Sequence, residues 1–303
     1  MKNKLFKYIG YLITLIAFIF IGKSIMSVNL QIKYIKSPIS TALLVIFISL
    51  CYSLIVFVSS CAWKITLEFI KSGKLSYKDI IPIYAKSNIG KYLPGNVMQF
   101  AGRNILASKL GFKQLDVTFC SLIEILMLLI TDCILSFIFA MKTFSNILRD
   151  ILLKIPPVIF ILICLLSLAI VIFFILKSKI IKQYRHFFSV NFIKLLLKLF
   201  VVYSFTLIIP GIFLFLLLKI SLYCKISLSL FFVIISSYTI SWVLGYIVPG
   251  APGGIGIRES ILILILGPFF SNNIVLLAAL LLRISSTAGD LLAFLAAYFI
   301  FKT

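Results

Sequence analysis

Two stretches of this chain combine helix-breaking residues with charged side chains inside a largely apolar sequence. They are Lys91–Arg103 and Val248–Glu259. Proline lacks a backbone N–H and glycine carries a large entropic cost in a helix, so helices are expected to break at Pro94–Gly95, at Pro249–Gly250 and at Pro252. Inside a bilayer, interrupted backbone persists only where protein or trapped water satisfies its polar groups. Each stretch is therefore a candidate binding site.

Arg103 and Arg258 each follow one of these breaks, close to the start of a new helix. A guanidinium group beside free backbone N–H groups at a helix N-terminus suits a phosphate. At membrane depth the expected anion is a phospholipid or polyprenyl-phosphate headgroup, with further polar contacts from Lys91, Gln99 and Glu259. The alternative is structural, with each arginine snorkelling to the interface or forming an ion pair with an acid.

Three glycines of the second stretch, Gly253, Gly254 and Gly256, have the spacing of a phosphate-cradling loop. A nucleotide loop of that kind follows a β-strand in a βαβ unit, and this sequence predicts neither. Two roles remain open for these glycines. They expose backbone amides to a lipid headgroup, or they form only a packing turn.

Each stretch leads into an apolar segment that holds two ionisable residues. Glu124 and Asp132 follow the first, eight positions apart, and Arg283 and Asp290 follow the second, seven apart. At these spacings each pair shares one face of a helix. Intramembrane ionisable groups usually line a cavity or an ion path, so we expect proton relay or contact with a cationic headgroup. A structural ion-pair network, for example Arg283 with Asp132, is the alternative.

The two stretches repeat one pattern. In each, Pro-Gly is followed by seven residues and an arginine, and the second copy lies 155 positions after the first. Paired interrupted segments in corresponding positions point to the binding site of a transporter. We therefore predict an internal repeat, with halves of about 1–155 and 156–303 in a single membrane domain. The halves run parallel if both broken segments are re-entrant, and they are inverted if one segment crosses.

Composition places these segments in a membrane. Of the 303 residues, 62% are hydrophobic, and the mean hydropathy is +1.21. A soluble domain is typically about 45–50% apolar. Runs of about 17–25 apolar residues recur along the chain, which predicts an all-α polytopic membrane protein with about seven to eight spans plus the two broken segments.

The expected elements follow from these runs. Spans are predicted up to about residue 21 and at 39–63, 117–141, 156–176, 199–218, 227–247 and 273–301, the fifth of them broken at Pro210–Gly211. Ile80–Gly111 is too polar for a simple span and predicts a re-entrant or interfacial hairpin. Residues 260–270 predict an apolar arm. Tyr92, Trp242 and Tyr246 near the span ends are typical of an aromatic belt.

The charge is strongly positive, at +21 from 29 Lys and Arg against 8 Asp and Glu. These cations lie in short loops between apolar runs, which indicates the positive-inside rule and anionic lipid headgroups, and not nucleic acid. The rule predicts a multi-pass protein of the cytoplasmic membrane with a cytoplasmic N-terminus. Six cysteines without a CxxC pair and a single histidine predict no metal site and no cofactor.

The two motifs together resemble a known family. Lys91–Gly95 with Gln99 and Gly102–Arg103, followed by Pro252–Glu259, is similar to the transmembrane region of lysylphosphatidylglycerol synthases and of the wider flippase-like membrane proteins that stand alone. The resemblance spans nearly the whole chain. It implies a domain that moves a lipid between leaflets, aminoacylated phosphatidylglycerol in the multiprotein-resistance relatives and a lipid-linked saccharide or glycolipid in others. A cytosolic synthase domain is not expected here.

We therefore expect a lipid flippase with the phosphate on Arg103 and Arg258, and membrane lipids as its partners. One rival is an integral-membrane transferase that acts on a lipid-linked substrate, with Glu259 as general base. Another is an accessory subunit that assists enzymes of cell-envelope synthesis, in which the broken helices only pack. The sequence contains no ATP-binding motif, so transport energy is expected from an ion gradient or from mass action.

Overall fold

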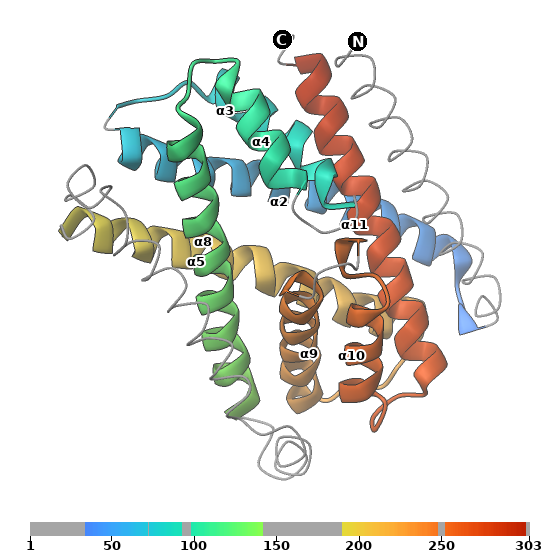
Figure 1. Cartoon of the computed structure of the whole chain (residues 1–303). Helices are drawn as coiled ribbons and strands as arrows, with labels where there is room; N and C mark the ends of the chain where they lie inside the picture. The colour runs from blue at the N-terminus through green and yellow to red at the C-terminus, as the bar shows by residue number, and fades with distance from the viewer. Residues whose placement is uncertain (1–33, 72, 93–97, 142–189, 248–251, 301–303) are drawn as a thin grey trace.

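The computed structural model describes residues 34–71, 73–92, 98–141, 190–247 and 252–300, and every element in these ranges is a helix (Figure 1). In chain order the elements are α2 (Pro38–Lys71), α3 (Tyr77–Asn88), η2 (Ile89–Tyr92), α4 (Met98–Ser108), α5 (Gln114–Met141), α8 (Val190–Leu216), η5 (Leu217–Ser221), α9 (Leu228–Ile247), η6 (Pro252–Gly254), α10 (Ile257–Leu266) and α11 (Asn272–Ile300).

Five helices in the described ranges are long and apolar enough to cross a membrane. They are α2, α5, α8 continued by η5, α9 and α11. These helices confirm five of the predicted spans and the assignment of the chain to a membrane. The two other predicted spans, before residue 22 and at 156–176, lie outside the described residues.

The long helices expose apolar side chains along continuous stripes. On α2 the exposed residues recur at helical spacing, and they are Ile39, Leu43, Ile46, Phe47, Leu50, Leu54 and Val58. On α8 the stripe is Val190, Ile193, Leu197, Val201 and Phe205. By contrast, Ser49, Ser60 and Thr66 of α2 are buried. Large exposed apolar surfaces rimmed by polar residues mark contact with a membrane or a partner, and these stripes suit lipid.

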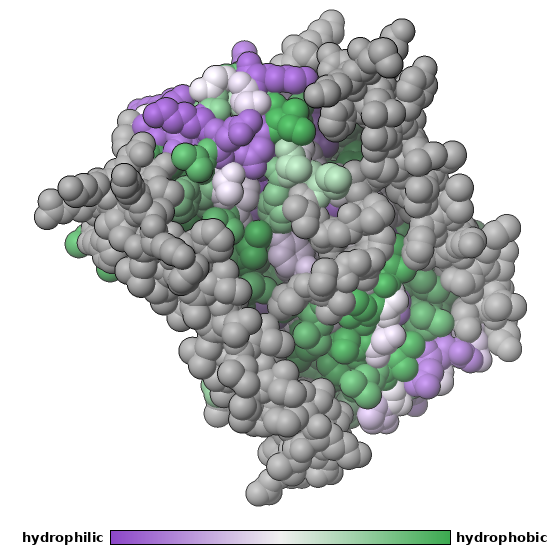
Figure 2. Space-filling view, in the orientation of Figure 1, coloured by the Kyte–Doolittle hydropathy of each residue, from purple (hydrophilic) through white to green (hydrophobic). Residues whose placement is uncertain are grey.

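Hydrophilic residues gather at two opposite ends of the visible face, with hydrophobic residues between them (Figure 2). The end that carries α3 and α4 is basic, and its exposed lysines are Lys71, Lys74, Lys78, Lys109 and Lys113. A basic rim next to an apolar band suits anionic lipid headgroups.

The two broken stretches form short helices that approach α11 from opposite ends (Figure 1). α3 packs against α4, and Lys86 of α3 lies over the ring of Tyr298 near the end of α11. On the other half of α11, Leu262 and Leu266 of α10 share a hydrophobic cluster with Val275. The short helix η2, which follows α3, contacts η6, which precedes α10.

Local sequence explains where the short helices begin. Ser76 is the N-cap of α3 and accepts a hydrogen bond from the backbone N–H of Lys78 at 3.2 Å, and Asp79 complements the helix dipole in the first turn. At α10, the Glu259 carboxylate accepts from the backbone N–H of Gly256 at 2.7 Å. Both helices therefore have a satisfied N-terminus, and that of α10 lies shortly after the predicted break at Pro252.

Helix pairs or single helices occupy the stretches that were predicted to be irregular. α3 and α4 cover most of the predicted hairpin Ile80–Gly111, and α10 covers the start of the predicted apolar arm. Pro252 begins η6. The breaks at Pro94–Gly95 and Pro249–Gly250 lie outside the described residues.

The predicted break at Pro210–Gly211 is wrong. α8 continues through both residues into the π-helix η5. Surrounding helices keep water from the backbone, so the loss of one helical hydrogen bond at a proline does not end a helix in this setting. Gly211 has a packing role instead, because a Cβ added there would lie 3.0 Å from Cα of Ile235 on α9. The backbones of α8 and α9 therefore approach closely at this point.

α2 and α11 cross at an equally close contact. A Cβ added to Gly289 of α11 would lie 2.6 Å from the backbone oxygen of Ser49 and would also overlap Cβ of Tyr52. Small residues at helix crossings allow such backbone approach in membranes, where van der Waals packing replaces the hydrophobic effect between helices. Gly289 thus fixes both the spacing and the rotation of α11 against α2.

We predict that Gly289→Ala lowers the free energy of unfolding by about 1–3 kcal/mol, because the added methyl group overpacks a backbone contact. Unfolding in mixed detergent micelles measures this change. The matched control is Gly102→Ala in α4, where a Cβ meets Ser87 at an ordinary 3.6 Å. That control should be neutral or stabilising by up to about 1 kcal/mol. Equal destabilisation by both changes would contradict the proposed close crossing.

Candidate functional site

A cavity of about 170 Å³ lies where the two broken segments meet α11. Every described element except η5 contributes to its wall. The wall contains eight of the predicted binding or intramembrane polar residues. They are Lys91, Gln99, Glu124, Gly253, Arg258, Glu259, Arg283 and Asp290. The wall does not include Arg103, Asp132, Gly254 or Gly256. Most of the predicted polar residues therefore converge, although they come from both halves of the chain.

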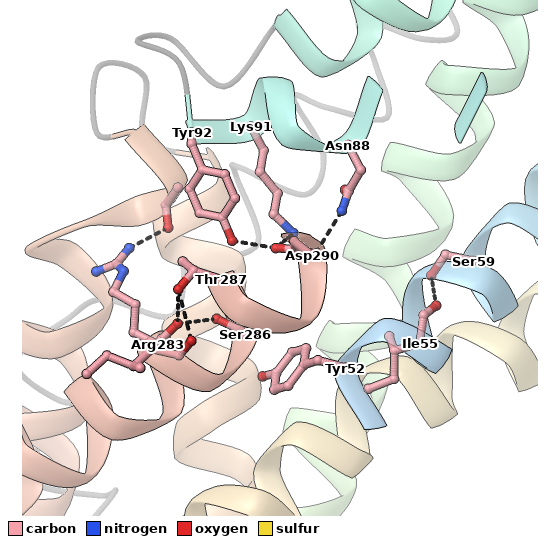
Figure 3. Close-up of polar contacts among 12 residues, drawn as sticks. Tyr52, Ile55, Ser59, Asn88, Lys91, Tyr92, Arg283, Ser286, Thr287 and Asp290 are labelled. Carbon is pink, nitrogen blue, oxygen red and sulfur yellow. Dashed lines mark hydrogen bonds and ion pairs between the residues drawn. The ribbon is translucent and has the colours of Figure 1, made fainter. Parts of the chain in front are cut away.

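Asp290 of α11 joins the first broken segment to the cavity (Figure 3). Its Oδ1 accepts from Asn88 Nδ2 at 2.8 Å, its Oδ2 accepts from the Tyr92 hydroxyl, and Lys91 Nζ lies 2.7 Å from Oδ2. Burial, followed by the charge of Asp290, raises the pKa of the Tyr92 hydroxyl well above its ordinary value. The phenol therefore keeps its proton and donates it. Three donors compensate a carboxylate that is 2% exposed.

Arg283 of α11 joins the second broken segment to the same cavity. Its Nη1 forms an ion pair with Glu259, and its Nη2 donates to the carbonyl oxygen of Gly253 at 2.9 Å. Figure 3 shows the side chain of Arg283 on α11. Glu259 also accepts from the Gly256 N–H, so both carboxylate oxygens have donors. Gly253 and Gly256 have φ of 58° and 83°, a conformation that favours glycine. Arg283 pairs with Glu259 and not with Asp132, which was the example expected from the sequence.

Arg103 lies behind the cavity wall. It is 1% exposed and forms an ion pair with Glu124 of α5, whose other oxygen accepts from the Tyr84 hydroxyl at 2.7 Å. The guanidinium carbon lies 4.1 Å from the ring centre of Tyr84 and 5.5 Å from those of Trp63 and Phe100. Of the two roles predicted for Arg103, this enclosure supports the ion pair with an acid.

Arg258 has a different environment, although it occupies the matching position in the sequence pattern. Its side chain lines the cavity, its guanidinium carbon lies 5.4 Å from the ring centre of Trp242, and its buried Nε has no hydrogen-bond partner among the described residues. A Cβ at Gly245 would lie 2.6 Å from Arg258 Cγ, and one at Gly254 would lie 2.7 Å from Nε. These two glycines therefore leave the space through which the side chain reaches the cavity.

The charges around the cavity do not balance. Around the cavity, three described cations are each neutralised by an acid. The pairs are Lys91–Asp290, Arg283–Glu259 and Arg103–Glu124. Arg258 forms no ion pair with a described residue, so it leaves one positive charge over. A half-buried cation without a counter-charge among the described residues favours the binding of an anion, because removing a lone charge from water is unfavourable.

Gln99 and Asp132 occupy separate places. Gln99 of α4 is 6% exposed and lies in the cavity wall. Asp132 of α5 is 1% exposed and lies outside that wall, and it forms no ion pair with a described residue. Glu124 and Asp132 therefore share a helix but not an environment.

Several cavity residues were missed or misplaced by sequence reasoning. Tyr92, Trp242 and Tyr246 line the cavity, where an interfacial aromatic belt was expected. The hydroxyls of Tyr52 and Tyr238 lie 3.3 Å apart in the same wall, and nothing in the sequence pattern singled them out. The sequence offered only a weak indication that these tyrosines line a cavity. A tyrosine in the middle of an apolar run differs from one in an aromatic belt only by its position.

Neither a known protein family nor a curated protein matches this sequence. Among the described residues, no group of three His, Cys, Asp or Glu side chains is placed to hold a metal ion. The residues of the cavity itself therefore supply the grounds for a function.

We predict that Arg103→Met lowers the free energy of unfolding by about 3–5 kcal/mol, because Glu124 is left as a buried charge without its partner. The double change Arg103→Met with Glu124→Met should recover all but about 1 kcal/mol, the remainder coming from the lost Tyr84 hydrogen bond. Unfolding in mixed micelles measures all three proteins. If Arg103→Met leaves stability unchanged and the double change gives no recovery, the ion pair is not the main role of Arg103.

Proposed function

We propose that this chain is a flippase-like lipid transporter of the cytoplasmic membrane, which moves a phospholipid such as aminoacylated phosphatidylglycerol, or a lipid-linked saccharide, between leaflets. The observation that carries the proposal is the unpaired guanidinium of Arg258 in a polar cavity among membrane-spanning helices. A lipid phosphate supplies the missing negative charge. Its oxygens match the planar donor fork of arginine, which forms two parallel hydrogen bonds.

The rest of the wall suits a headgroup with several polar atoms. Gln99 and the hydroxyls of Tyr52 and Tyr238 offer neutral hydrogen-bonding groups around Arg258. Lys91 is 31% exposed in its side chain and is the second cation within reach of an anionic group. In this proposal Arg258 holds the phosphate, whereas Arg103 supports the wall from behind through Glu124.

Two ion pairs connect the broken segments to α11, and we propose that they act as gates. Lys91–Asp290 holds the first segment and Glu259–Arg283 holds the second. Because these segments approach α11 from opposite ends, the opening of one pair exposes the cavity toward one leaflet while the other stays closed. Alternating access to a fixed central site follows from such an arrangement.

The order of elements supports an internal repeat. A helix, a break, a short helix and a long helix occur as α3, η2, α4, α5 and again as α9, η6, α10, α11. Their approach from opposite ends of α11 favours inverted over parallel halves. By the rule given for the sequence, inverted halves require one of the broken segments to cross the membrane. The proposed domain has a cytoplasmic N-terminus and its basic rim of lysines on the cytoplasmic side.

The transferase alternative receives no support from the cavity. Glu259 was the expected general base, but Arg283 and the Gly256 N–H already bind both of its oxygens. A general base needs a free oxygen within reach of the proton that it takes. Envelope-synthesis enzymes remain proposed as the partners that supply or use the transported lipid.

The test is leaflet exchange in liposomes that contain the purified protein and labelled phosphatidylglycerol, lysyl-phosphatidylglycerol or a polyprenyl-phosphate sugar. We expect exchange of at least one of these lipids, and a loss of about tenfold or more with Arg258→Gln, since a charge-assisted hydrogen bond contributes about 1.5–3 kcal/mol. Arg258→Lys should keep part of the activity, because it retains the charge but not the fork.

The matched control is Lys109→Gln, which removes an exposed charge at the basic rim, outside the cavity wall. It should leave exchange unchanged. If Arg258→Gln and Lys109→Gln exchange lipid equally well, Arg258 does not hold the headgroup. If a donor substrate is converted to product while no lipid changes leaflet, the chain is a transferase.

A further inference from the structure

Asp132 is a buried acid that the proposed headgroup site does not use. It is 1% exposed, and both carboxylate oxygens lack a hydrogen-bond partner in the described part of the chain. Four other acids of low exposure in that part form ion pairs, and they are Glu68, Glu124, Glu259 and Asp290. Asp132 therefore stands out as a carboxyl group without a cation.

The surroundings of Asp132 consist of hydroxyl groups that are bonded elsewhere. Ser136 and Thr239 are its polar neighbours at the interface of α5 and α9. Their hydroxyl oxygens lie 3.0 Å from each other, and the Thr239 hydroxyl donates to the backbone oxygen of Ser236 at 3.0 Å. The hydroxyl of the adjacent Thr131 is fully buried and has no partner. The hydroxyls beside Asp132 are thus shared with other acceptors, and neither of these two neighbours carries a positive charge.

No described charge compensates Asp132 from the helices that pack on α5. Those helices are α2, α4, α8 and α9. Their charged residues are Lys64 and Glu68, which pair with each other, Lys71 at the exposed end of α2, Arg103, which pairs with Glu124, and Lys194 and Lys198 in the first turns of α8. α9 contains no charged residue, and its tyrosines are Tyr238 and Tyr246.

We infer that Asp132 binds a proton and that its protonation is coupled to binding of the lipid anion at Arg258, so that the transporter moves a proton together with its lipid. A buried ionised carboxylate without a compensating cation is strongly unfavourable, whereas a protonated carboxyl donates to a neighbouring hydroxyl. The proton comes from water and returns to water on the other side. The coupling rests on the proposed lipid transport, but proton binding does not.

Tyr238 links the two sites. It lines the cavity, its hydroxyl lies 3.3 Å from the Tyr52 hydroxyl, and it directly precedes Thr239, the polar neighbour of Asp132. An anion at Arg258 disfavours a second negative charge nearby, so it favours the protonated state of Asp132. Linkage is reciprocal, so a proton on Asp132 also favours anion binding. One phosphate monoanion and one proton together carry no net charge across the membrane.

The first experiment measures the carboxyl group directly. Infrared difference spectra of the purified full chain in detergent, recorded across a pH titration, should contain the carbonyl band of a protonated carboxyl group that disappears at alkaline pH. Asp132→Asn should lack this band, whereas the control Asp79→Asn, which changes an exposed acid of α3, should retain it. Identical spectra of wild type and Asp132→Asn at every pH would overturn the inference. So would a band that responds to sodium but not to pH.

The second experiment measures coupling in liposomes with labelled phosphatidylglycerol. A pH difference across the membrane should shift the leaflet ratio by up to about tenfold per pH unit, the limit for one coupled proton. Asp132→Asn should still exchange lipid but lose the response to the pH difference, and Asp79→Asn should keep it. Exchange without any pH response in wild type overturns the coupling alone. No exchange of any tested lipid overturns the proposed function, while the infrared result still decides proton binding.

Discussion

The compensation of charge at membrane depth is the constraint on which this structure depends. α11 carries one cation and one anion seven positions apart, and each is bound by a different broken segment. Asp290 receives three donors from the first segment, and Arg283 receives a carboxylate and a carbonyl oxygen from the second. The broken backbones are therefore fixed where charge requires them. The cavity is the space that remains between these two attachments.

Close helix packing makes that attachment specific. Gly289 directly precedes Asp290, and its contact with Ser49 and Tyr52 fixes the rotation of α11 against α2. Because neighbouring positions on a helix point about 100° apart, the rotation that seats Gly289 also turns Asp290 toward Asn88 and Tyr92. Backbone contact and charge compensation thus support the same orientation. A bulkier side chain at the crossing would disturb both.

Much of the fold could be predicted from the sequence, since apolar run length reports spans directly. Most of the polar residues in the cavity wall were predicted, because polar groups inside apolar runs are unfavourable unless they bind a partner or a ligand. The partners of these residues were not predicted. Asn88 and Asp290 lie 202 positions apart, and local spacing contains no information about such a contact. Pro210 was mistaken for a break because propensity measured in water overstates the effect of a proline that lipid and protein surround.

The need to compensate charge also explains why the arginines of the two repeated patterns, Arg103 and Arg258, have different environments. Arg103 is followed by α5, which presents Glu124 to it, so its charge is neutralised within its own half. After Arg258 the neighbouring acid, Glu259, is taken by Arg283, because α11 carries its own cation at that depth. The acid of the second half therefore compensates α11 and leaves Arg258 available. Two paired arginines would leave the cavity without an attraction for anions, and two unpaired ones would be too unfavourable to bury together. A single unpaired arginine gives an anion site that the fold tolerates.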